Sequence, residues 1–295
     1  MTNMAERHAL MTAILFTGLT VAASPSHAQS QLIGEQFAPI RPPVSVRYGS
    51  GNSQIMNFWR ASGRTPAPLV LIIESSGWPT SPKPSTYKLA ATLAASGIAV
   101  AAMGSRPNRP VGVRDVIADA RDMLQCLASQ AERRGIQKDQ LAIIGVGSAG
   151  AAAALMATDP NWTGGTSLFF ENLRALILID AVGFDPELTL QTARSDRRAK
   201  ILESLGETEE KRKANSAVSH LAMPNVPNAL LLVSEERRNE RSSADFSALL
   251  NEHGIIAEVR KMPRSDTSTN RGIFGNELNP ETKALVAYLA QRLGK

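Results

Sequence analysis

Six residues after an apolar run at 141–144 could support chemistry of two different kinds. The run Gly145-Val146-Gly147-Ser148-Ala149-Gly150 leads directly into an alanine-rich stretch typical of a helix. A serine on a tight turn between a strand and a helix can attack a carbonyl carbon when a neighbouring base removes its proton. The same six residues also fit Gly-x-Gly-x-x-Gly, whose backbone N–H groups cradle the pyrophosphate of a dinucleotide. A third interpretation is that these glycines only let a helix pack closely on a strand.

Ser148 is the candidate nucleophile of this run, and two alignments with a Gly-x-Ser-x-Gly turn are open. If Ser148 is aligned with the serine, Val146 falls two residues before it, where a strained turn favours small residues. If Gly145 is aligned with the first glycine, Gly147 takes the nucleophile position and the hydroxyl group is lost. The dinucleotide alternative has its own difficulty. It requires an acidic residue about twenty positions further on, whereas Asp180 lies thirty residues after Gly150.

The elements that must position this turn are strands alternating with helices. Six continuous apolar runs are typical of strands buried on both faces, at 69–73, 98–103, 141–144, 176–179, 229–233 and 255–262. Helical stripes separate them, as in Val113, Val116, Ile117, Ala120, Leu124 and Leu127. Gly254 is expected to stop one helix, and Asn279-Pro280 to start the last one. Before these units, 44–48 and 54–59 flank Gly49-Ser50-Gly51-Asn52-Ser53, which predicts an antiparallel hairpin.

This order predicts a three-layer α/β/α sandwich with a mostly parallel twisted sheet. Ligands bind beyond the carboxyl ends of the strands in such sheets. The segments that follow four of the strands are therefore the candidate site, at 74–78, 145–150, 234–240 and 266–271.

These four segments, in this order, resemble the α/β-hydrolase fold, in the branch of small esterases with acetyl esterases, feruloyl-esterase-like proteins and arylformamidases. The resemblance covers roughly residues 66–293. Residues 72–78 are similar to a strand followed by His-Gly-Gly-Gly-Trp, and residues 266–271 to the loop Asp-His-x-Thr-x-Asn-Arg. The resemblance implies hydrolysis of small carboxylic esters by a Ser-His-Asp triad. It also implies oxyanion-hole positions at Ser75, Ser76, Gly77 and Ala149.

Several family positions carry the wrong residue for that mechanism. Glu74 replaces the histidine of the oxyanion loop, and Thr267 stands where the resemblance places the catalytic histidine. Beyond residue 28 the chain has two histidines, His220 and His253, and neither falls in that loop. Glu235, Glu236 and Glu240 are the candidate acids after the fifth run. We therefore interpret Glu74, Gly147 and Thr267 as degenerate positions of a pseudoenzyme with no recognisable complete triad. The alternatives are an active hydrolase that uses Ser148 and a dinucleotide-binding protein.

Composition and the amino terminus suggest an exported protein. The chain has 295 residues, 43% hydrophobic and 20% charged, with a net charge of +5. Residues 9–23 are apolar and small, and Ser26-His27-Ala28 is typical of a signal-peptide cleavage site, which predicts export to the periplasm or outside. We expect a signal peptide at 1–28, an extended segment at 29–43 and a hydrolase-like domain at 44–295, with 184–225 as a cap.

The basic residues are scattered, which argues against a nucleic-acid partner. A lone Cys126 excludes an internal disulfide. We expect no cofactor, no metal site and no membrane attachment after cleavage, and a small-molecule ligand or ester as the partner.

Overall fold

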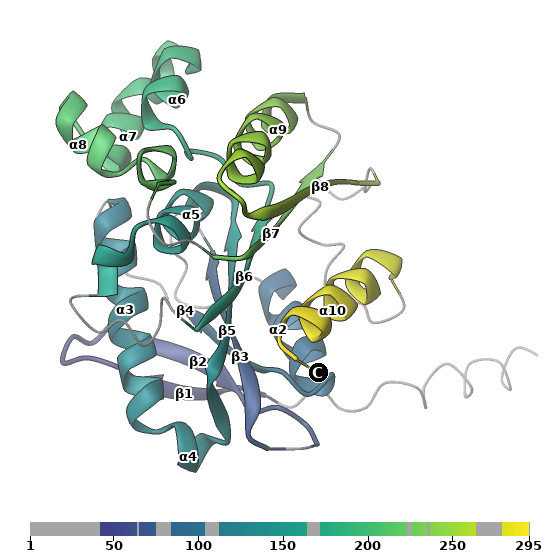
Figure 1. The fold of residues 1–295 in the computed structure, drawn as a ribbon. Helices are drawn as coiled ribbons and strands as arrows, with labels where there is room; N and C mark the ends of the chain where they lie inside the picture. The colour runs from purple at the N-terminus through teal and green to yellow at the C-terminus, as the bar shows by residue number, and fades with distance from the viewer. Residues whose placement is uncertain are drawn as a thin grey trace, which may run out of the picture. The chain divides into compact units, whose positions relative to one another are not determined.

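One eight-stranded sheet forms the centre of the computed structural model, with the strand order β1-β2-β4-β3-β5-β6-β7-β8 (Figure 1). The structure describes residues 42–63, 65–74, 84–103, 112–163, 172–222, 226–234, 237–263 and 279–294. The strands are β1 Val44–Arg47, β2 Ile55–Trp59, β3 Ala67–Glu74, β4 Ala99–Met103, β5 Ile136–Val146, β6 Leu173–Ile179, β7 Asn228–Ser234 and β8 Ile256–Met262. Each of the six predicted apolar runs coincides with a strand.

Strand directions confirm the predicted architecture. β1 pairs antiparallel with β2, and β2 antiparallel with β4, while all the other neighbours are parallel. β5 lies inside the sheet, between β3 and β6. It begins at Ile136, five residues before the apolar run, because Ile136 pairs with Ala67 at the start of β3. Residues 137–140 of this extension were not predicted as strand, because all four are polar and so lack the apolar pattern of a buried strand.

Helices cover both faces of the sheet and bury alternate residues of each strand. α3 (Val113–Ser129), α5 (Gly150–Thr158) and α9 (Arg237–Glu252) lie on one face, and α2 (Pro84–Ala95) and α10 (Pro280–Arg292) on the other (Figure 1). Along β3, Leu69, Leu71 and Ile73 join the first core, whereas Val70 and Ile72 join the second. Burial of each such side chain contributes about 1.5–3 kcal/mol. This alternation fixes β3 as an interior strand of a three-layer sandwich.

Local signals set the helix ends as predicted. Asn279 precedes α10, its side chain accepts a hydrogen bond from the Glu281 N–H at 2.8 Å, and Pro280 is the first helical residue. Gly254 follows α9 with a φ of +81°, in the left-handed region that ends helices. Among the described residues, no helix is long and apolar enough to cross a membrane.

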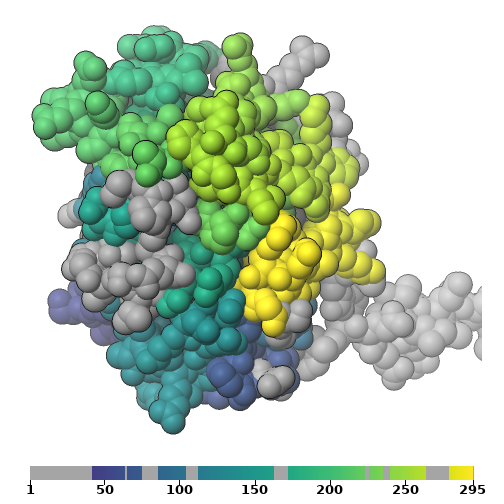
Figure 2. Space-filling model, viewed as in Figure 1, coloured from purple at the N-terminus to yellow at the C-terminus, as the bar shows by residue number. Residues whose placement is uncertain are grey.

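The described part of the predicted cap region, residues 184–222, contains helices joined by short loops and no strand. These are α6 Pro186–Thr192, α7 Ser195–Leu205, α8 Glu209–Ala214 and the short η4 Ala217–His220. Arg212 Nε lies 2.6 Å from Glu187 Oε1 and joins α8 to α6. Figure 2 shows these helices gathered in one green group at the top of the molecule. The expectations for residues 1–41 lie outside the described residues.

The side chain of Arg114 connects the cap to the body of the domain. Arg114, at the start of α3, donates to Asn215 Oδ1 at 2.6 Å and to the Ala214 carbonyl at the end of α8. Its Nη1 also lies 3.4 Å from Oδ2 of the buried Asp159, which follows α5. Arg114 therefore holds the end of α8 against the end of α5.

Candidate functional site

The candidate turn lies directly at the end of the central strand β5. β5 ends at Val146, whose extended backbone (φ −115°, ψ 126°) belongs to the strand. Gly147 follows with a φ of +63°, and Gly147–Ala149 form one turn of 3-10 helix before α5 begins at Gly150. The change from strand to helix therefore takes place at Gly147, in a backbone conformation that favours glycine.

Close packing explains the two glycines on either side of this turn. A Cβ on Gly145 would lie 2.5 Å from the Cβ of Ala153, on the first turns of α5. A Cβ on Gly150 would collide with Ala181, just after β6. These contacts account for both glycines without a bound pyrophosphate, and so favour the packing interpretation of the Gly-x-Gly-x-x-Gly pattern over the dinucleotide one.

Ser148 stands one residue beyond the strained position. It is exposed, whereas its neighbours Gly147 and Ala149 are buried. In a hydrolase of this fold, the nucleophile itself occupies the strained residue between strand and helix. By that criterion the candidate for the nucleophile position is Gly147, and the candidate for the backbone N–H that follows it is Ser148, in place of the predicted Ala149.

Register brings Glu74 beside this turn. Glu74 at the end of β3 is paired with Val146, so its backbone lies next to the last residue before Gly147. The side chain is half-buried, and the hydroxyl of Thr86 in α2 donates a hydrogen bond to Glu74 Oε2. This hydrogen bond from Thr86, a residue not anticipated there, connects the end of β3 to the first turn of α2.

Asp180 is a site residue that sequence reasoning considered only as a dinucleotide ligand. It follows β6, whose last residue Ile179 pairs with Val146, and it has a φ of +47°. Among the described residues it is the only residue other than glycine with a positive φ. Such strained residues gather at functional sites. The signal in the sequence was a carboxylate directly after the apolar run next to β5.

Two hydrogen bonds connect Asp180 and the segment after it to the same edge of the sheet. Asp180 Oδ1 accepts from the N–H of Ser234, the last residue of β7, at 2.7 Å. Two residues on, the Val182 N–H donates to the carbonyl of Gly147 at 3.3 Å. The ends of β3, β5, β6 and β7 therefore meet around Gly147, as the parallel topology predicted.

The contacts of the two described histidines lie away from this turn. His253 follows α9, at the amino end of β8, and its Nδ1 lies 2.8 Å from the Leu249 carbonyl. His220 lies at the end of η4, with Nε2 3.2 Å from the Ala214 carbonyl and 4.0 Å from Asp159 Oδ2. Both histidines are thus engaged outside the turn that holds Ser148.

One of the predicted acids, Glu240, forms an ion pair away from the turn. Glu240 was expected in the loop after β7, but it lies in α9, where its carboxylate is 2.6 Å from Lys261 Nζ. That prediction of a loop was wrong, because α9 begins at Arg237, in a charged stretch without the apolar residues that would have predicted a helix.

Several predicted site positions lie outside the described residues: Ser75, Ser76, Gly77, Glu235, Glu236 and Thr267. Among the described residues, no group of three or more acidic, histidine or cysteine side chains is arranged to hold a metal ion.

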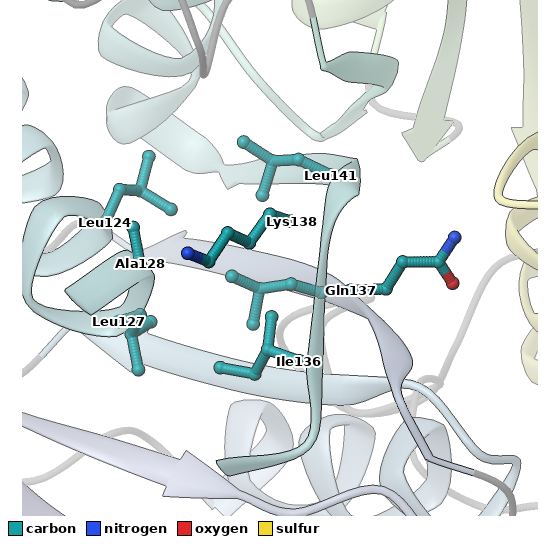
Figure 3. Close-up of a pocket in the computed structure, with 8 residues that line it drawn as sticks. Leu124, Leu127, Ala128, Ile136, Gln137, Lys138 and Leu141 are labelled. Atoms are coloured by element: carbon teal, nitrogen blue, oxygen red, sulfur yellow. The ribbon is translucent and has the colours of Figure 1, made fainter. Parts of the chain in front are cut away.

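A small cavity of the protein lies at the opposite edge of the sheet. It has a volume of about 20 Å³ and lies between α3 and the start of β5 (Figure 3). Its lining is mainly apolar: Leu69, Leu124, Leu127, Ala128, Ile136, Gln137, Lys138 and Leu141. A space of this size holds about one water molecule. It is therefore a packing defect between α3 and β5 and too small for an ester.

Comparison with known proteins places this architecture in the α/β-hydrolase superfamily, among proteins of carboxylesterase type. The model of the BD-FAE family matches residues 58–231, which is more than half of the chain. The chain therefore belongs to the BD-FAE family. No curated protein sequence is significantly similar to it.

Solved structures of two bacterial esterases share the fold. Esterase B from Lactobacillus rhamnosis (HN001) is 20% identical over 90% of this chain and 94% of its own, with a TM-score of 0.65. Esterase 2 from Thermogutta terrifontis, solved phosphonylated by sarin, is 16% identical over 86% of this chain and 95% of its own, with a TM-score of 0.68. At these identities the similarity establishes a common fold and nothing about activity.

Proposed function

We propose that this chain is an exported member of the esterase-type α/β-hydrolases that has lost efficient hydrolysis and binds a small ester or a related carbonyl ligand. One observation carries the proposal: the positive φ directly after β5 belongs to Gly147 and not to Ser148. A glycine at this position has no hydroxyl group to attack a carbonyl carbon. Export rests on the amino-terminal sequence, in which Ala28 closes the predicted cleavage site.

Neither of the two described histidines contacts the turn, which supports the same proposal. A serine hydroxyl is a weak nucleophile without an adjacent base, and the contacts of His220 and His253 lie elsewhere. Loss of the catalytic histidine alone lowers turnover by about a millionfold in a serine hydrolase. Loss of both groups removes the covalent step and leaves binding of the substrate as the remaining function of the site.

Backbone groups at the turn can still bind a carbonyl oxygen. The Ser148 N–H follows the strained residue, the position that supplies one oxyanion donor in this fold. The half-buried carboxylate of Glu74 lies on the neighbouring strand end. A negative charge there disfavours an oxyanion but not a neutral ester. The site is therefore better suited to a neutral ligand than to a tetrahedral intermediate.

Hydrolysis of short p-nitrophenyl esters tests this proposal. We expect the rate with the mature protein to equal the uncatalysed background, and Ser148→Ala to leave it unchanged. Incubation with a reactive phosphonate, followed by mass spectrometry, should detect no adduct on Ser148. Binding of the same esters, followed by saturation-transfer NMR, should be saturable.

A second candidate function is hydrolysis by Ser148, which its exposure at the carboxyl edge of the sheet favours. Rapid ester turnover that Ser148→Ala abolishes would establish it and refute the degenerate site. Export is tested separately, because amino-terminal sequencing of the secreted protein should begin at Gln29. A secreted chain that still begins at Met1 would contradict the predicted cleavage.

A further inference from the structure

Three arginine side chains converge at the amino edge of the sheet, on the side away from Gly147. β2 runs antiparallel to β4, and its last residue, Trp59, pairs with Val100 near the start of β4. Arg60 therefore emerges at the amino edge. Arg133 and Arg134 end the short helix α4 (Ala131–Arg134), immediately before β5 begins. We call Arg60, Arg133 and Arg134 the arginine cluster.

Hydrogen bonds hold the arginine cluster in place. Arg60 Nη2 donates to the Arg133 carbonyl at 2.6 Å. Gln130 Oε1 accepts from both Arg133 Nη2, at 2.7 Å, and Arg134 Nε, at 2.9 Å. The guanidinium groups of Arg133 and Arg134 therefore share the neutral oxygen of Gln130, and that of Arg60 is anchored to the Arg133 carbonyl.

An aromatic ring also holds the Arg134 guanidinium group in place. Arg134 Cζ lies 5.1 Å from the centroid of the Phe58 ring, and Phe58 is buried in β2. A guanidinium group stacked on a ring keeps its N–H groups pointing away from the ring, available to an acceptor. Arg134 is half-buried, whereas Arg60 and Arg133 are exposed.

The guanidinium groups of the cluster make no ion pair within the described part of the protein. None of the described ion pairs includes Arg60, Arg133 or Arg134. Burial of the guanidinium group, together with the charges of Arg133 and Arg60, lowers the pKa of Arg134. The three cations thus repel one another, and an anion between them would relieve that repulsion.

We propose that the arginine cluster is a binding site for a phosphate-type oxyanion. The guanidinium fork matches two oxygens of a phosphate group, and several forks fixed on one anion bind it more strongly than mobile lysines. Gln130 acts as a positioning residue, because it orders Arg133 and Arg134 before the anion arrives. The anion is either free phosphate or the phosphate of a lipid headgroup. This site is separate from the candidate ester site and does not depend on its function.

Titration with inorganic phosphate and with vesicles tests the proposal on the full chain. Calorimetry at low ionic strength should give saturable phosphate binding, and Arg60→Gln/Arg133→Gln should weaken it about tenfold. Both side chains are exposed, so this double variant should keep the wild-type melting temperature. Gln130→Ala should also weaken binding, although it removes no charge. The matched control is Arg194→Gln/Arg197→Gln, at the exposed residue before α7 and in its first turn, which removes the same charge and should leave the affinity within about twofold.

Vesicles distinguish the two sources of phosphate. If the ligand is a lipid headgroup, the protein should sediment with vesicles containing about one third phosphatidylglycerol and not with pure phosphatidylcholine, and the double variant should lose this binding. If the ligand is free phosphate, binding to phosphate should be saturable and binding to vesicles absent. Absence of both forms of binding, or equal affinities in the double variant and the control, would overturn the proposal.

Discussion

The backbone N–H of Ser234 donates a hydrogen bond to Oδ1 of Asp180 at 2.7 Å, which joins the carboxyl ends of β7 and β6. Asp180 makes this bond from the left-handed region, with a φ of +47°. Aspartate and asparagine visit that region at lower cost than most other residues because their short side chains bond locally. The residue type at position 180 is therefore determined by both the conformation and the bond.

Substitution of Asp180 should measure what these two effects contribute together. Asp180→Asn keeps an acceptor oxygen and tolerates the positive φ, so we expect it to lower the free energy of unfolding by less than about 1 kcal/mol. Asp180→Ala loses the bond and strains the backbone, with an expected cost of about 2 kcal/mol. Urea denaturation measures both. Equal losses in the two variants would show that the hydrogen bond to Ser234 contributes nothing.

A double substitution at the turn and in the loop after β8 should restore ester hydrolysis if Gly147 occupies the nucleophile position. Gly147→Ser provides the hydroxyl group, at a cost of about 1–2 kcal/mol for the positive φ. Thr267→His provides the base at the position that the family resemblance assigns. We expect Gly147→Ser/Thr267→His to hydrolyse p-nitrophenyl acetate measurably above background, by a small factor because Glu74 disfavours the oxyanion.

The matched control for this restoration is Thr267→His alone, which leaves Ser148 as the available hydroxyl group. We expect no gain from it. If the single variant is as active as the double variant, the nucleophile position belongs to Ser148 and the degenerate-site proposal fails.

The Asn251 side chain shields the backbone of the edge strand β8. Its amide donates to the Ala257 carbonyl at 3.0 Å and accepts from the Ala257 N–H at 3.1 Å. A neighbouring strand would make the same two bonds, so Asn251 blocks strand pairing at this point. We expect Asn251→Ala to lower the free energy of unfolding by about 1–2 kcal/mol and to increase self-association in light scattering.

Asn251→Asp provides the control for edge protection. It keeps the acceptor for the Ala257 N–H but cannot donate to the carbonyl when ionised. Its effect on both measurements should be intermediate. A monomeric Asn251→Ala protein at high concentration would contradict the protective role of this side chain.

Tyr288 should make the fold sensitive to alkaline pH. Burial in the core under α10 raises the pKa of Tyr288, an effect that nearby Arg292 partly opposes. The unfolded chain therefore releases this proton first, at about pH 10, and the folded chain at higher pH. The contribution to stability is fully present below about pH 10 and is lost as the pH rises towards the pKa of the folded state.

Denaturation curves at several alkaline pH values should detect this loss. The wild-type protein should lose stability more steeply above about pH 10 than Tyr288→Phe, which has no phenol to titrate at this position. Tyrosine absorbance should show one late-ionising group in the wild-type protein that the variant lacks. Identical pH profiles would contradict the assignment to Tyr288.

The order of strands and helices could be read from the sequence because each element carries its own periodic signal. The runs at 69–73 and 176–179 are apolar without interruption, and both are interior strands. Asn279 and Gly254 marked helix ends through local side-chain and backbone chemistry. The polar start of β5 and the first turns of α9 were missed. Pairing with Ala67 extends β5, and packing on the sheet extends α9, although the residues concerned show no apolar periodicity.

The sequence by itself determined the fold, the family and the presence of a glycine-rich turn at the end of the central strand. It left open which residue of that turn occupies the strained position, since Gly145-Val146-Gly147-Ser148 fits two alignments equally well. The tertiary structure shows where the strained backbone lies: the positive φ is at Gly147, between the end of β5 and the start of α5. The carboxylate of Asp180 and the hydroxyl of Thr86 likewise joined the site through strand register and helix packing. Such contacts arise between residues far apart in the chain, and local spacing carries no record of them.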